Sequence, residues 1–243
     1  MVYDCAREWS ELPIRWESDL ALAADVIFAA SYGLIDRLSP CNDNIALLPN
    51  GANYPMFAQN RLECPPELRN LAGPVLGYAG TIWRDLDLAP VLLCARQMPR
   101  CTFLFLGRRE RNPALSALEK LRNVYFLGQC PPGEVPDYLD RFDVCMSLPR
   151  LHDPENDVVS TQVYEYLSAG QPVVALYRRD QVEPFPDVIY AAHTPEEFAG
   201  LCRRALSETG DWAKNRRRAH GAAAAWSCRA EEVERMLEAN GLY

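Results

Sequence analysis

The sequence predicts an α/β fold, a Rossmann-like parallel sheet with helices on both faces. From residue 74 onward, short apolar runs alternate with helical patterns at a spacing typical of such a sheet. The clearest run, Pro172 to Leu176, is apolar and β-branched, as expected of a buried parallel strand. The predicted strands are 74–79, 101–106, 123–127, 143–148, 173–176 and 188–191. Helices are predicted near 86–97, 112–120, 133–141, 159–169 and 195–207.

The segments on either side of this repeat are less regular. Val2 to Asp4 looks like the end of a strand, and Pro49-Asn50-Gly51 is a strong turn signal. Between them we expect a helix over 17–24, a strand over 25–31, a short helix over 32–39 and a strand over 45–48. Residues 52–73 read as a polar loop with a short helix over 66–71. The tail, 211–242, reads as two helices with a bend around Trp226 and Ser227.

Composition limits the function classes. A chain of 243 residues is one large domain or two small ones, and 49% apolar residues suffice for a core. A formal charge of −8 argues against general nucleic-acid binding. No stretch approaches the roughly 20 apolar residues of a membrane span, and the start does not resemble a signal peptide.

Nine cysteines are scattered along the chain, and no pair has the C-x-x-C spacing. Several lie in apolar runs, so they read as small buried hydrophobes rather than as metal ligands or disulfides. With only three histidines, we expect no metal and no other cofactor. The pattern suits a reducing compartment, so the expected location is the cytoplasm, including its membrane face as a peripheral site.

The most informative stretch runs from Asp157 to Leu176 in the order loop, helix, glycine turn, strand. The amides at a helix start lack intrahelical partners, and the helix dipole makes that end a site for anions. Glu165 lies four residues after Thr161, one turn into the helix and on the same face. A carboxylate there can accept two hydroxyl hydrogen bonds while the amides hold a diphosphate. A nucleoside diphosphate presents both features.

The ends of the earlier strands supply further candidates. Glycines Gly80 and Gly107 follow two predicted strands, where a glycine lets backbone approach a ligand closely. Ligands of such sheets bind outside the C-terminal strand ends. Arg84, Arg108 and Arg109 are the available cations for a diphosphate. A solvated surface arginine is the competing interpretation for each.

The stretch resembles the nucleotide-sugar signature of retaining, group 1 type glycosyltransferases of the GT-B fold. That signature has two acids eight positions apart, the second opening an E-x-x-A-x-G-x-P-V-V run. Glu165 matches the second acid, Asp157 stands in place of the first glutamate, and Gln162 stands where many relatives carry lysine. The strings G-Y-A-G-T and N-V-Y-F-L-G follow the family's order. The chain is thus similar mostly to the family's C-terminal, nucleotide-sugar-binding domain.

The opening residues resemble the same family. The strings Y-D-C-x-x-x-W and L-L-P-N-G-A-N look like the end of its N-terminal domain and the linker. The resemblance implies three segments: 1–49 as a remnant of that domain and linker, 50–226 as the nucleotide-sugar-binding domain, and 227–243 as a helix crossing to the N-terminal domain. Since the acceptor-binding half would be almost wholly missing, we expect the isolated chain to transfer little sugar.

The resemblance also implies roles for single residues. Glu165 would anchor the ribose, Asp157 would touch a sugar hydroxyl, and Arg84 or Arg109 would supply a cation. The base would meet backbone at Cys130. The nucleotide-sugar-binding set is Gly80, Thr81, Gly107, Arg108, Cys130, Pro131, Val159, Ser160, Thr161 and Glu165. His152 lies in a loop near the implied sugar site, where a surface histidine is the favoured interpretation over a sugar contact.

The leading functional interpretation is the donor-binding part of a glycosyltransferase that uses a nucleoside-diphosphate sugar, such as a UDP-sugar, in surface polysaccharide or glycan assembly. Its partners would be that donor and an unknown acceptor glycan or lipid. A non-catalytic nucleotide-sugar-binding chain, or one subunit of a split transferase with a separate acceptor-binding chain, stays open. A nucleotide-sugar epimerase is less favoured, because its acid-base residues cannot be placed here.

Overall fold

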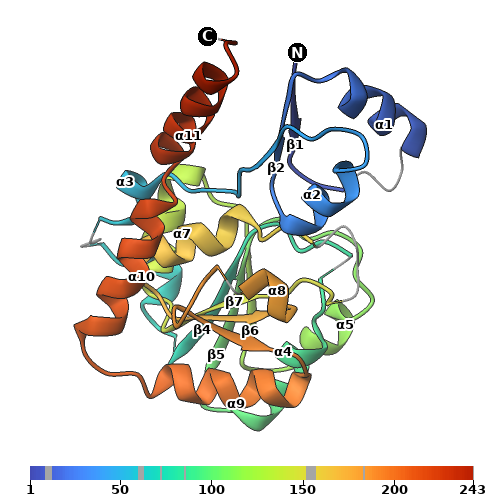
Figure 1. Ribbon diagram of the computed structural model, residues 1–243. Helices are drawn as coiled ribbons and strands as arrows, with labels where there is room; N and C mark the ends of the chain where they lie inside the picture. Colours follow the sequence, from blue (N-terminus) through green and yellow to red (C-terminus); the bar gives the residue numbers. More distant parts are fainter. Residues whose placement is uncertain are drawn as a thin grey trace.

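The computed structural model describes residues 1–8, 13–59, 63–71, 73–84, 86–151, 157–182 and 184–242. Within these ranges the chain forms a three-stranded sheet and a six-stranded sheet, each with parallel pairing. Figure 1 shows the smaller sheet, in blue, lying beyond one end of the larger one. The predicted α/β architecture with a parallel, helix-covered sheet is confirmed.

The smaller sheet and its helices, from Val2 to Leu47, are called the N-terminal unit here. Its strand order is β1-β2-β3, and the central strand is buried along its whole length because helices and neighbours cover both faces. Ser31 caps the second helix: its Oγ accepts from the Leu34 amide at 3.2 Å. The elements are β1 (Val2–Cys5), α1 (Ile14–Ala23), β2 (Val26–Ala29), α2 (Tyr32–Leu38) and β3 (Ile45–Leu47).

The larger sheet has the order β6-β5-β4-β7-β8-β9. The chain starts at β4 in the middle, builds outward to β6, then returns to place β7 on the other side of β4. This reversal creates a switch point between β4 and β7, where ligands of open α/β sheets bind beyond the C-terminal strand ends. The strands are β4 (Val75–Ala79), β5 (Thr102–Leu106), β6 (Val124–Gly128), β7 (Val144–Ser147), β8 (Val173–Leu176) and β9 (Ile189–Ala192).

Both faces of the larger sheet are buried, which explains its continuously apolar strands. In β8, Val173 and Ala175 join the core cluster under α6, α7 and α3, whereas Val174 and Leu176 join the cluster under α4, α5 and α9. The helices and short 3-10 turns are α3 (Tyr54–Phe57), η1 (Pro66–Leu68), α4 (Ala89–Gln97), α5 (Leu115–Leu118), η2 (Pro132–Glu134), α6 (Val135–Leu139), α7 (Thr161–Ala169), α8 (Arg179–Val182), α9 (Pro195–Leu206), α10 (Asp211–Ala223) and α11 (Trp226–Ala239).

Helix α7 forms where the sequence predicts it. Ser160 is its N-cap, and Gly170 ends it with a left-handed φ of 82°, which glycine adopts without steric cost. Val163 and Leu167 are fully buried against the sheet, whereas Glu165 is only half-buried. The helix therefore presents its first turn and Glu165 at the C-terminal edge of the strands.

The tail differs slightly from expectation. The predicted bend at 226–227 falls at Ala224–Ala225, because backbone hydrogen bonds with Ala52 fix the chain there: the Ala52 amide donates to the Ala224 carbonyl and the Trp226 amide donates to the Ala52 carbonyl. Beyond it, α11 extends alongside the N-terminal unit (Figure 1), where Asn44 Nδ2 donates to Asn240 Oδ1 at 2.6 Å. Helices α3 and α8, each of four residues, were not predicted, since one helical turn leaves too few residues for a periodic pattern.

Among the described residues, no helix is long and apolar enough to span a bilayer.

Candidate functional site

Glu165 faces open space at the edge of the sheet. Burial without a compensating donor raises the pKa of its carboxyl to about 6. None of the residues that the structure describes donates a hydrogen bond to it, whereas buried carboxylates are ordinarily hydrogen-bonded. A half-buried acceptor without a donor suits a site completed by the hydroxyls of a ligand.

Glu165 lines a cleft of about 370 Å³ beyond the ends of β4, β5 and β6, called the β4–β6 cleft. Sequence-predicted residues that line it are Gly80, Thr81, Gly107, Arg108, Cys130, Thr161 and Glu165. Leu106 and Val135 add apolar wall. The structure thus brings most of the predicted binding set to one place.

Two glycines shape this cleft. A Cβ at Gly107 would lie 2.0 Å from the carbonyl oxygen of Gly80, and a Cβ at Gly80 would lie 2.0 Å from Nε2 of Gln162. Their φ angles of 141° and 153° are also rarely adopted by residues with side chains. Only glycine fits at both positions, which leaves bare backbone facing the cleft.

A second cleft, of about 470 Å³, lies at the switch point between β4 and β7 and is called the β4–β7 cleft. It shares Thr81, Thr161 and Gln162 with the first, and Ser160 lines it as well. The N-terminal unit's side contributes Ala6 and Arg7. The start of α7 therefore lies between two clefts that share lining residues.

Sequence reasoning missed several residues of the β4–β7 cleft. Ser147 Oγ and Tyr177 Oη are 3.1 Å apart at the ends of β7 and β8, and Tyr78 Oη donates to the Thr81 carbonyl at 2.9 Å. Burial raises the pKa of Tyr177 to about 12, so it is a neutral hydroxyl at physiological pH. Extending the strand-end rule to β8 would have found Tyr177. Gln162, noted in the sequence only for standing in place of a lysine, donates through Nε2 to the Ala79 carbonyl.

The three predicted arginines have different surroundings. Arg108 lines the β4–β6 cleft, pairs with Glu110 at 2.8 Å and lies 5.9 Å from the ring of Trp83. Arg109 donates to Glu119 at 2.8 Å and lies over Phe126. Arg84 is exposed, and its carbonyl accepts from Arg150 at 2.8 Å. Arg108 is the cation best placed for an anionic ligand; phosphate roles for Arg84 and Arg109 stay predictions.

Asp157 and Val159 lie at the junction of the N-terminal unit and the larger sheet's domain. They line a cavity of about 110 Å³ between the N-terminal unit and the larger sheet's domain. One carboxylate oxygen of Asp157 accepts from Ser31 and the other from Arg178. The structure places this carboxylate at that junction rather than among the residues lining either cleft, and its predicted sugar contact stays a prediction.

The remaining predicted residues complete the picture. Cys130 reaches the β4–β6 cleft directly after β6, whereas Pro131 is exposed at the start of η2. His152 lies outside the described residues. Across the described ranges, no group of three or more His, Cys, Asp and Glu side chains could hold a metal ion.

The clefts, the glycine turns and the helix start lie at the C-terminal strand ends of a Rossmann-like domain, and sequence comparison gives the family. The family described as "Glycosyl transferase-like" matches residues 89–236. The chain belongs to this glycosyl transferase-like family.

One curated relative is the protein of Bacillus subtilis (strain 168) named for teichuronic acid biosynthesis, glycosyltransferase TuaH. It is 28% identical over an alignment of 257 positions that covers 94% of this chain and 64% of that protein. The chain thus spans less than two thirds of the length of this relative.

Solved structures share the fold. HepE of Anabaena, in complex with UDP and glucose, superposes with a TM-score of 0.75 at 16% identity, covering 98% of this chain and 71% of HepE. Sucrose-phosphate synthase of Thermosynechococcus elongatus superposes with a TM-score of 0.71 at 18% identity, covering 91% of this chain and 60% of the synthase. These likenesses confirm the GT-B type of fold.

Proposed function

We propose that this chain binds a nucleoside-diphosphate sugar and serves as the donor-binding part of a glycosyltransferase. The observation that carries the proposal is Glu165, a half-buried carboxylate that receives no hydrogen bond within the described part of the chain. It lines a glycine-walled cleft one turn from a helix start. Its two oxygens can accept the two ribose hydroxyls. The base would lie beside Cys130, and the diphosphate beside the amides at the start of α7.

The proposed chemistry is electrostatic. When the bond between the anomeric carbon and the diphosphate oxygen breaks, negative charge grows on the departing diphosphate. The acceptor hydroxyl forms the new glycosidic bond, and its proton passes to that diphosphate. Amides of Ser160 and Thr161, with Arg108, would stabilise this charge in a preorganised site. We expect no metal to be needed, since these groups supply the positive charge.

UDP is the first nucleotide to test, because HepE was solved with UDP. The β4–β7 cleft would hold the sugar and admit the acceptor, a glycan or a lipid-linked glycan. Membership of a family with a relative named for teichuronic acid biosynthesis supports surface polysaccharide assembly as the process. All nine cysteines are free thiols, which supports a cytoplasmic location.

The test is a thermal-shift and calorimetric panel of UDP, GDP and dTDP in the presence of a chelator. At a hundredfold excess over Kd, binding to the folded state alone stabilises it by about 2.7 kcal/mol, which is a readily measured melting shift. A shift with one of the three supports the proposal. Absence of a shift with all three, or a shift that the chelator abolishes, would contradict it.

A further inference from the structure

The residues between the N-terminal unit and the start of α7 form a connection that the proposed donor site does not explain. We propose that Asp157 is a positioning residue, which couples the N-terminal unit, through Ser31, to the helix start that holds the donor's diphosphate. This inference rests on the proposed function, because it concerns the same site.

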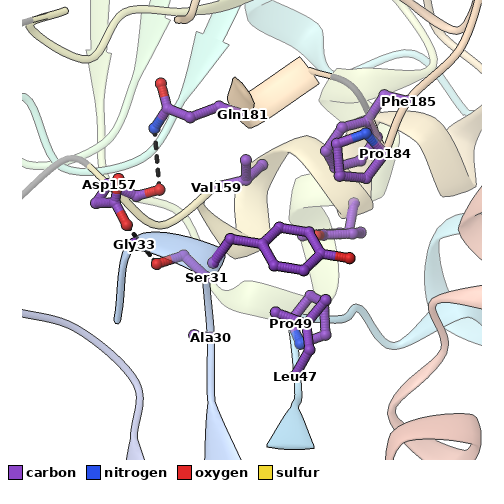
Figure 2. A pocket seen from close by; sticks show the side chains of 12 residues that line it. Ala30, Ser31, Gly33, Leu47, Pro49, Asp157, Val159, Gln181, Pro184 and Phe185 are labelled. Atoms are coloured by element: carbon purple, nitrogen blue, oxygen red, sulfur yellow. Dashed lines mark hydrogen bonds between the residues drawn. The ribbon is translucent and has the colours of Figure 1, made fainter. Parts of the chain in front are cut away.

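The carboxylate of Asp157 joins two parts of the chain. Ser31, at the N-cap of α2 in the N-terminal unit, donates to Oδ2, while Arg178, just after β8, donates to Oδ1. Gln181 Nε2 donates to the Asp157 carbonyl at 3.0 Å. Figure 2 shows the Ser31 and Gln181 side chains reaching Asp157 from opposite sides. Only 14% of the Asp157 side chain is exposed, because these partners surround it.

The next residues extend this hold to the helix. Val158 packs against the core cluster of the N-terminal unit, and Asn50 Nδ2 donates to the Val159 carbonyl at 2.9 Å. Ser160 follows as the N-cap of α7 and lines the β4–β7 cleft. Residues 157–159, directly before the amides proposed to hold the diphosphate, are therefore each fixed by a contact outside α7. A shift of the N-terminal unit would then move the start of that helix.

The junction of the two parts is loosely packed on one side of Asp157 and tight at Gly33. The apolar surfaces beside Asp157 leave a cavity of about 110 Å³ among Tyr32, Pro49, Tyr164 and Phe185. At Gly33, by contrast, an added Cβ would lie 2.5 Å from Asp157 Oδ2. Asp157 thus contacts the N-terminal unit closely at Ser31 and Gly33. This contact contributes to the relative position of the two parts, together with the packing of Val158 and the Asn44–Asn240 hydrogen bond.

If Asp157 instead bound the sugar, its substitution would affect the two ligands differently. Sugar binding would require the carboxylate to face the β4–β7 cleft, and its removal would weaken binding of the full donor only. A positioning role predicts equal weakening of UDP and UDP-glucose, because both use the diphosphate site. It also predicts that Ser31, which belongs to the other part of the chain, matters as much as Asp157.

The experiment titrates UDP and UDP-glucose by calorimetry into the full chain and into Ser31→Ala, Asp157→Asn and their double variant. We expect each single variant to weaken both ligands roughly three- to tenfold, a typical range for coupling through a packed network. The double variant should bind no more weakly than the weaker single variant, because the Ser31–Asp157 contact that the two substitutions share can be lost only once. Ser31→Thr keeps the hydroxyl and should restore wild-type affinity.

Two further variants separate positioning from loss of stability. Ser31→Ala also removes the cap of α2, so Gly33→Ala, which keeps the cap but crowds Asp157, should give the same loss of affinity. Ser39→Ala, at the other end of α2, should leave affinity unchanged. Unchanged UDP affinity in folded Ser31→Ala and Gly33→Ala, or weakening of UDP-glucose alone in Asp157→Asn, would overturn this inference only. Failure of the wild-type chain to bind any nucleotide would overturn the proposed function and this inference with it.

Discussion

Asp157 and Glu165, the two acids of the glycosyltransferase-like motif, are eight positions apart in sequence but have very different surroundings. Around Glu165 the structure has a carboxylate to which no described residue donates, two turn glycines and a helix start that lines a cleft. Around Asp157 it ties both carboxylate oxygens to other residues. The surroundings of Glu165 suit the binding of hydroxyl and phosphate groups, whereas those of Asp157 connect two parts of the chain. Chemical identity in a motif therefore does not fix what a residue touches.

The largest expected effect is at the cleft. Glu165→Gln should weaken UDP binding roughly 10- to 150-fold, since hydrogen bonds to a charged acceptor contribute about 1.5–3 kcal/mol. Calorimetry on folded variants measures this, with the exposed Glu231→Gln in α11 as the matched control. If Glu165→Gln bound UDP as tightly as the wild type, Glu165 would not be part of the binding site, and the proposed difference between Glu165 and Asp157 would be wrong.

The backbone of the cleft gives the next effect. Gly107→Ala should lower the free energy of unfolding by about 1–3 kcal/mol, because its Cβ would press on the Gly80 carbonyl at a backbone conformation unfavourable to alanine. Gly133→Ala, with open space around it, should change stability by less than about 0.5 kcal/mol. Chemical denaturation of both variants compares them. Equal stabilities would mean that the close approach of the two strand ends is not a constraint.

Ligand affinity at the β4–β6 cleft should also depend on pH. Since burial raises the pKa of Glu165 to about 6, the carboxylate is lost as pH falls through that value, and affinity for UDP-glucose should drop about tenfold by pH 5. UDP-glucose suits this test because its diphosphate, esterified at both ends, does not titrate in this range. Glu165→Gln should remove the pH dependence.

The same pKa shift predicts the stability of the empty protein with the opposite sign. The folded-state pKa lies above the ordinary value of 4.5, so the contribution of Glu165 to stability is present below that value and is lost as pH rises through about 6. Glu165→Gln should therefore melt higher than wild type at pH 8, and the difference should vanish near pH 4. A variant less stable than wild type at pH 8 would show that Glu165 has a structural partner.

The smallest effect separates neighbouring arginines. Arg108→Ala should weaken UDP binding roughly three- to tenfold, since an exposed charge on a phosphate contributes about 1 kcal/mol. Arg109→Ala should change it less than about twofold, because that guanidinium is engaged with Glu119 and Phe126. Titrations of the two variants at one ionic strength decide between them. A larger loss of UDP affinity in Arg109→Ala than in Arg108→Ala would mean that the diphosphate binds nearer Arg109 than proposed here.

The features of the fold that depend on local sequence pattern could be predicted from the sequence. Strand-helix repetition predicts all six strands of the larger sheet, and Gly170 marks the end of α7 at its observed residue. Strand-end glycines predict the β4–β6 cleft, because parallel strands end at one edge. The role of Asp157 could not be read in the same way. Its partners Ser31 and Arg178 are 126 and 21 residues distant, and no local pattern encodes such contacts.

Amide hydrogen exchange with and without UDP tests the central claim most directly, since it reports where the nucleotide binds. The account predicts slower exchange at the start of α7, residues 160–165, and at the turns after β4, β5 and β6. It predicts lesser changes at the junction cavity around Tyr32 and Phe185. Protection confined to that cavity, or absent from the start of α7 at saturating UDP, would contradict the assignment of the donor site.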